Sequence, residues 1–87
     1  MTKTKDPNVN RVTSDQYEAA LRYVRALRDT KQYRVTYYYG VVLGPNGTAT
    51  GAHYESPRAC GFEDDITSEA SKGNTLVVVR GRDVQWS

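Results

Sequence analysis

The sequence predicts an α+β domain in which an N-terminal helix is followed by a small, strongly bent antiparallel β-sheet or barrel of four to five strands. Apolar residues recur with helical spacing after residue 13, and strand-like alternation follows over residues 33–43. Near the end of the chain, Arg80-Gly81 interrupts an apolar run. A chain of 87 residues has room for one domain with a small core. We therefore assign residues 1–13 to a flexible N-terminal tail and residues 14–87 to this single domain.

The predicted helix begins at Thr13 or Ser14, either of which can cap it, and continues to about Arg28. Its apolar side chains follow the i, i+3, i+4, i+7 spacing, at Tyr17, Ala20, Leu21, Val24 and Leu27. This spacing places them on one stripe, which predicts the face that packs against the sheet.

Two strands are predicted on either side of a turn. Residues 33–43 alternate with period two and are rich in tyrosine and valine, and Gly44-Pro45-Asn46-Gly47 supplies turn residues before a return strand over residues 48–54. A four-residue loop would place Gly40 opposite Gly51. Facing glycines suit either a bend in a barrel or a strip of backbone that a ligand approaches closely, and we favour the bend.

The C-terminal segment predicts two further strands. Leu76 to Val79 is apolar throughout, and Val84 to Trp86 resumes apolar alternation after a short polar break. Residues 55–73 predict a loop with a short strand around residues 59–62, in which Phe62 and Ile66 anchor the loop to the core. The last strand would present an uncovered edge, which favours a homo-oligomer.

Composition narrows the class of protein. One cysteine cannot form an internal disulfide, and no stretch reads as a signal peptide or a membrane span, so we expect a cytoplasmic protein without a membrane partner. The net charge is only +2 but uneven, since residues 1–34 are basic and residues 55–69 are acidic. Such a dipolar chain suits a polyanion or a complementary copy of itself.

The sequence carries no pattern typical of an enzyme, so we expect no catalytic residues, no metal and no cofactor. A single histidine and a single cysteine cannot make the usual four-ligand zinc site. No glycine-rich phosphate loop joins a strand to a helix. A nucleophilic pair of Cys60 and His53 is formally possible, but nothing in the local sequence supports it.

The remaining signal is that of a binding module. Seven tyrosines and exposed arginines suit single-stranded nucleic acid, and the same residue types suit a protein interface. The candidate contacts for a nucleic acid or another partner are Arg34, Tyr38, His53, Arg80, Gly81 and Arg82. The alternative is a small regulator or inhibitor that docks on a protein through its tyrosine-bearing sheet or through an acidic loop of Glu63, Asp64 and Asp65.

The order of elements and one motif resemble the Sm-like family of small barrels. The run from Val78 to Val84 (VVRGRDV) is similar to the family's second signature, and Asn46 to Gly51 is similar to the turn and second strand of its first. The resemblance implies a bent five-strand barrel that assembles into a ring, with Arg80 and Gly81 lining the pore and contacting RNA. No counterpart of the family's Asp-x-Met-Asn follows Tyr54, so the residues expected for uridine recognition are missing.

Overall fold

The computed structural model describes residues 12–85, and their elements alternate between helix and strand. In chain order these are α1 (Ser14–Leu27), β1 (Tyr38–Leu43), β2 (Ala49–Ser56), the 3-10 helix η1 (Ala59–Phe62), α2 (Glu63–Ser71), β3 (Thr75–Arg80) and α3 (Gly81–Gln85). The strands form one antiparallel sheet in the order β2-β1-β3. No helix within the described range is long and apolar enough to cross a bilayer.

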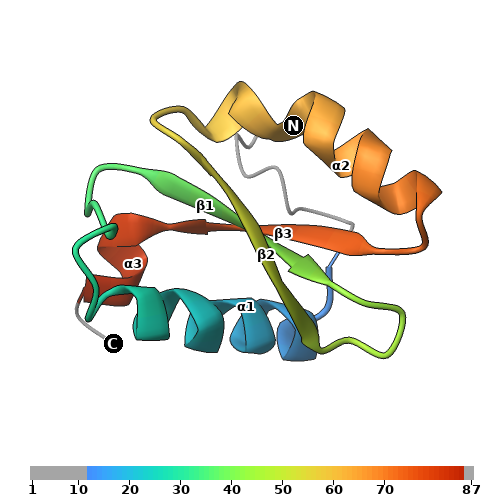
Figure 1. Cartoon of the computed structure of the whole chain (residues 1–87), viewed down its shortest axis with the longest axis horizontal. Helices are drawn as coiled ribbons and strands as arrows, with labels where there is room; N and C mark the ends of the chain where they lie inside the picture. Colours follow the sequence, from blue (N-terminus) through green and yellow to red (C-terminus); the bar gives the residue numbers. More distant parts are fainter. Residues whose placement is uncertain (1–11, 86–87) are drawn as a thin grey trace, which may run out of the picture.

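Helices cover both faces of the sheet. In Figure 1, α1 lies below the sheet and α2 lies above it. Because successive strand residues point to opposite faces, β1 and β3 each contribute to two cores. Tyr39, Val41 and Leu43 pack with Val77, Val79 and α1, whereas Val42, Leu76 and Val78 pack with Phe62 on the α2 side. The central strand and β3 are therefore apolar on both faces, as is typical of strands buried between two layers.

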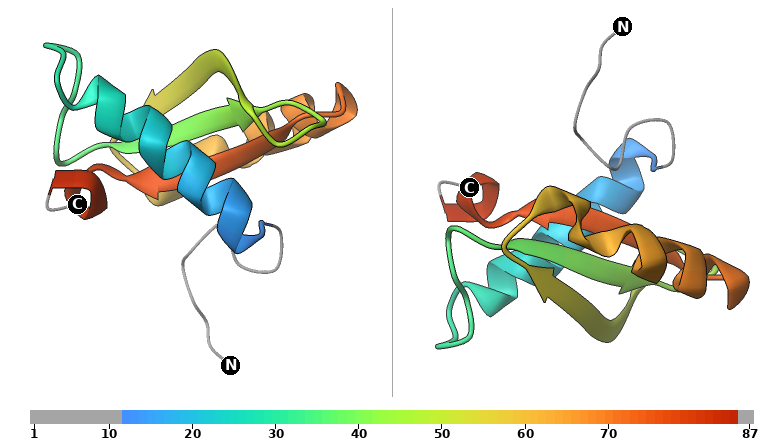
Figure 2. Two further views of the ribbon diagram at one scale, coloured as in Figure 1. Left: turned by 90° about the horizontal axis from the view of Figure 1, so that it is seen from below. Right: turned by 90° about the horizontal axis from the view of Figure 1, so that it is seen from above.

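The expected barrel of four to five strands is wrong. The sheet is open, with three strands, and Figure 2 shows β2 and β3 as its two edges. The helices remove the need for closure, because α1 covers one apolar face of the sheet and α2 with η1 covers the other. Residues 33–37, expected to extend the first strand, instead approach β1 through turns, and Tyr37 N–H bonds to the carbonyl of Arg34 at 3.0 Å.

The predicted last strand is also wrong, because the chain turns into α3 directly after Arg80. Gly81 N–H still donates to the Tyr37 carbonyl at 2.8 Å, which continues the β3–β1 pairing by one residue. The residues that follow form a helical turn. Across it, two guanidinium nitrogens of Arg80 each donate to a carboxylate oxygen of Asp83 at 2.9 Å. Val84 is fully buried in the core beside α1 rather than paired in a sheet, and Trp86 lies outside the described residues.

The first helix is confirmed. Thr13 caps α1, since its hydroxyl accepts from Gln16 N–H at 3.2 Å and the Gln16 side chain accepts from Thr13 N–H at 2.8 Å. This reciprocal pair is a capping box. The five residues of the predicted stripe all pack in the core of this face, and Ala20 and Val24 are fully buried. Residues 1–11 of the predicted tail lie outside the residues that the structure describes.

The hairpin forms at the predicted turn, but the predicted pairing of its strands is wrong. Leu43 pairs with Ala49, whereas Gly40 pairs with Tyr54 rather than with Gly51. A bulge lies between these two pairs, and Gly51 there takes a φ of +97°, which favours glycine. Gly40 is not bare, because a Cβ there would lie 2.9 Å from Leu76 and 3.0 Å from Phe62. The two glycines therefore serve a packed core and a bulge, and they do not face each other across the hairpin.

Residues 55–73 are mostly helical rather than a loop. The segment expected as a short strand is η1, and α2 follows it directly. Phe62 is buried in the core and Ile66 packs against it, so both anchors were predicted correctly. Glu69 fixes the far end of α2, because its carboxylate accepts from the Tyr54 hydroxyl at 2.7 Å and from the Asn74 amide at 3.0 Å.

Candidate binding site at the basic end of the sheet

The connection between α1 and β1 is fastened to the start of α3. Gly81 is the central residue, since its N–H donates to Tyr37 and its carbonyl accepts from the Tyr33 hydroxyl. Arg28 adds a second link, because its guanidinium donates to the carbonyl of Val84 at 2.8 Å. Two segments far apart in the sequence thus form one surface at one end of the sheet, at the left of Figure 1.

Only glycine fits at position 81. A Cβ built there would lie 2.7 Å from the carbonyl oxygen of Arg34 and 2.8 Å from those of Val35 and Tyr37. Three backbone oxygens cannot all move aside without breaking the turn that carries them. Gly81 is therefore buried and has a structural role: it shapes the site but offers no side chain to a ligand.

A small cavity opens between these two segments. It has a volume of about 30 Å³ and is lined by residues of both, namely Val35, Thr36, Tyr37, Tyr38, Arg80, Gly81 and Arg82. That volume is enough to admit a group the size of a water molecule. The cavity can therefore take a small polar group, such as one oxygen of a phosphate or carboxylate.

The arginines around the cavity differ in how free they are. Arg80 forms a two-bond ion pair with Asp83, which raises the pKa of its guanidinium and occupies the side of the fork that faces Asp83. Arg34 is exposed and places its guanidinium 5.2 Å from the centre of the Tyr37 ring, a cation–π contact. Arg82 is exposed at the first turn of α3. Arg34 and Arg82 are thus the better placed to meet an anion.

The same end carries an excess of positive charge. Residues 28–38 and 80–83 hold five basic side chains and two acidic ones; the basic ones are Arg28, Lys31, Arg34, Arg80 and Arg82. One of the acids, Asp83, is already paired with Arg80. We call this surface, built from residues 28–38 and 80–83, the basic end. Of the six candidate contacts that the sequence suggested as one set, the structure thus brings five to this end, namely Arg34, Tyr38, Arg80, Gly81 and Arg82.

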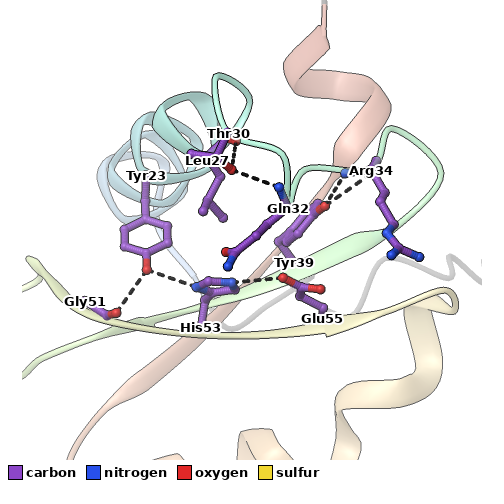
Figure 3. A network of polar contacts seen from close by, with 9 residues as sticks. All are labelled: Tyr23, Leu27, Thr30, Gln32, Arg34, Tyr39, Gly51, His53 and Glu55. Carbon is purple, nitrogen blue, oxygen red and sulfur yellow. Dashed lines mark hydrogen bonds and ion pairs between the residues drawn. The ribbon is translucent and has the colours of Figure 1, made fainter.

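His53 does not belong to this surface. It lies on the α1 side of β2, where its Nδ1 is 3.0 Å from the Tyr23 hydroxyl and its Nε2 is 3.2 Å from a Glu55 oxygen (Figure 3). The Tyr23 hydroxyl also donates to the carbonyl of Gly51 at 3.0 Å. The Tyr39 ring also lies near the imidazole, with the two ring centres 6.2 Å apart. Each ring nitrogen of His53 therefore has a structural neighbour, and the group ties α1 to β2.

The acidic residues of the alternative hypothesis also have a structural role. Glu63, Asp64 and Asp65 form the first turn of α2, on the face of the sheet opposite α1. Negative side chains in a first helical turn stabilise it through the partial positive charge of the free N–H groups. They are not an irregular docking loop.

Sequence reasoning missed two polar groups that the fold creates. The first is Glu69, a buried carboxylate whose pKa is lowered chiefly by the hydrogen bond from Asn74 and then by that from Tyr54. The second is the group of Tyr23, His53 and Glu55, which joins residues about thirty positions apart. A glutamate amid polar residues carries no sequence signal of burial, and only the spacing of His53 and Glu55, i and i+2 on one strand, could have indicated their contact.

The structure does not assemble the formal pair of Cys60 and His53. Cys60 is exposed on η1, on the α2 side of the sheet, while the imidazole lies on the α1 side. Across residues 12–85, no three His, Cys, Asp or Glu side chains gather closely enough to hold a metal ion.

Comparison with known proteins leaves the function to be argued from this site. No protein-family model matches the chain, and no significant match is found among the curated proteins or among the solved structures.

Proposed function

We propose that this protein is a non-enzymatic binding module that holds single-stranded nucleic acid at the basic end. One observation carries the proposal: Arg82 lines a cavity together with Tyr37 and Tyr38, and Arg34, from a distant segment, holds its guanidinium over the Tyr37 ring; both cations are exposed. Arginine forks suit phosphate oxygens, and tyrosine rings offer faces on which unpaired bases stack. Lys31, exposed in the same loop, adds a further phosphate contact.

The geometry favours backbone contacts over base-specific ones. The cavity of about 30 Å³ accepts a phosphate oxygen but is too small to enclose a base. Tyr38 is half-buried and packs against the core beneath α2, so only part of its ring is open for stacking. The module should therefore bind different sequences with similar affinity, as single-strand binders without hydrogen-bond readout do.

Fluorescence anisotropy with labelled single-stranded RNA and DNA of mixed sequence tests this proposal. Affinity should fall as salt is raised from about 50 to about 200 mM, since each neutralised phosphate releases counterions. The double variant Arg34→Ala/Arg82→Ala should bind at least about tenfold more weakly and with a shallower salt dependence. Arg22→Ala/Lys72→Ala removes the same charge from exposed positions outside the basic end and should bind nearly as the parent does.

The variant Asp83→Asn should change the affinity in the opposite direction. It weakens the ion pair, frees the Arg80 guanidinium and removes a negative charge, so binding should tighten. Asp64→Asn on α2 makes the same charge change on the other face and serves as the control. If the parent shows no measurable affinity at low salt, or if all double variants lose affinity equally, the proposed site is wrong.

Docking on a partner protein through the acidic residues has less support. Glu63, Asp64 and Asp65 stabilise the first turn of α2, and this role accounts for the acidic cluster without a partner protein.

A further inference from the structure

The strand β2 leaves one edge of the sheet unpaired. Within the described residues it pairs only with β1, and no helix or strand lies beyond it in either view of Figure 2. Most of its residues are exposed or half-buried, whereas Leu76 to Val79 of the other edge strand are at most 4% exposed. Unpaired strand edges present rows of N–H and C=O groups that can pair with another chain.

The pairing of the sheet shows which groups of β2 point outward. Gly81 N–H bonds to the Tyr37 carbonyl, so the odd-numbered residues of β1 bond to β3. In an antiparallel ladder these positions alternate, and the even-numbered residues of β1 therefore bond to β2. Their partners are Tyr54 and Ser56. It follows that the main-chain groups of His53 and Glu55 face away from the sheet.

Only a short part of this edge is suitable for pairing. At one end the bulge at Gly51 turns the strand, the Gly51 carbonyl accepts from Tyr23, and the Ala52 N–H donates to the Thr50 hydroxyl at 3.3 Å. At the other end Pro57 has no N–H to donate. The usable window is thus residues 52–56, with His53 and Glu55 supplying the outward groups.

We propose that this window pairs with the same window of a second copy of the chain, antiparallel and about a two-fold axis at Tyr54. In that register His53 faces the second copy's Glu55, and each such pair exchanges both main-chain hydrogen bonds. The result is one continuous sheet across two molecules. The inference does not depend on the proposed nucleic-acid function.

Side-chain chemistry selects this register and this occupant. An axis at Tyr54 places each imidazole against a carboxylate of the other copy, which is a favourable cross-strand pair. An axis at Glu55 would instead place two carboxylates face to face, and would set His53 against Pro57. An axis at His53 would oppose the two imidazoles and set Glu55 against the bulged Gly51. Because β2 is complementary to itself in one register, a second copy fits it without any other partner.

Sedimentation equilibrium on the full chain over a range of concentrations provides the first test. The average mass should rise from that of one chain toward that of two. Glu55→Lys removes the carboxylate from both pairs and places an ammonium group against each imidazole, so it should raise the dissociation constant at least about tenfold. Glu63→Lys makes the same charge change on α2 and should dimerise as the parent does.

A cysteine test in a Cys60→Ser background reports the register. At a non-hydrogen-bonded pair the two Cα atoms lie about 4.5 Å apart, within the range of a disulfide, so Tyr54→Cys should cross-link on mild oxidation. Ala52→Cys should not, since its two copies would be about 14 Å apart along the strands. A parent that stays monomeric throughout leaves the edge to another protein's strand or to none, and overturns the proposal. Dimers that Glu55→Lys does not weaken, or that cross-link at position 52, overturn it equally.

Discussion

At the scale of single residues, Gly81 decides both the fold of the C-terminal segment and the shape of the basic end. It is the last residue that pairs with β1 and the first of α3. Its missing side chain lets three carbonyl oxygens of the preceding loop approach closely. The sequence offered Arg80-Gly81 as a break between strands, and the position of the break was predicted correctly. The contact that makes glycine necessary comes from Arg34 to Tyr37, more than forty positions away, and no local pattern could reveal it.

Gly81→Ala should therefore lower the free energy of unfolding by about 1–3 kcal/mol, the cost typical of forcing an extra carbon into a filled space. Urea denaturation followed by circular dichroism measures the loss. Gly44→Ala is the matched control, since a Cβ there would meet its nearest atom at 3.5 Å and no strained φ is involved. Equal stability of Gly81→Ala and the parent would show that the loop does not close over residue 81.

At the scale of elements, the sequence predicted correctly those elements whose stabilising contacts lie within the element itself. The first helix was predicted because the cap and the apolar stripe both lie within it. The last strand was mispredicted because Val84, whose alternation with Trp86 suggested a strand, packs against α1 from a helical turn that the ion pair of Arg80 with Asp83 spans. The register of the hairpin failed because Leu43 pairs with Ala49 rather than with Thr48, and because β2 has two extra residues between this pair and the pair of Val41 with His53. The sequence predicted most of the candidate contacts at the basic end, but it did not predict that Asp83 pairs with Arg80.

The capping box of α1 makes a prediction at this scale. Thr13→Ala removes the hydroxyl that accepts from Gln16 N–H, which should cost about 1 kcal/mol of stability. Ser14→Ala, one residue further along and exposed, has no such bond and should change stability little. Thermal or urea unfolding of both variants gives the comparison, and equal midpoints would mean that Thr13 does not cap the helix.

At the scale of the whole molecule, three tyrosine hydroxyls besides that of Tyr23 join parts of the fold. Tyr33 reaches Gly81, Tyr39 donates to the Arg34 carbonyl, and Tyr54 donates to Glu69. Burial is the main cause that raises the pKa of Tyr33 and of Tyr39, and the hydrogen bond to Glu69 is the main cause for Tyr54. In each case the fold favours the protonated phenol, so alkaline solution opposes folding.

The sign of the pH dependence follows from these shifts. A group whose pKa is higher in the folded chain than in the unfolded chain contributes its full stability below the unfolded pKa, which for tyrosine is about 10. That contribution is lost as pH rises through the folded pKa, because the unfolded chain releases the proton first. The urea midpoint should therefore stay level up to about pH 9 and fall above about pH 10.

Tyr54→Phe removes one of the three titrations and should make the fall shallower, although it lowers the midpoint at neutral pH by leaving Glu69 without that donor. Tyr37→Phe controls for tyrosine content, because it keeps the ring that contacts Arg34, and a midpoint that stays level to pH 11 in the parent would show that these hydroxyls do not join the layers.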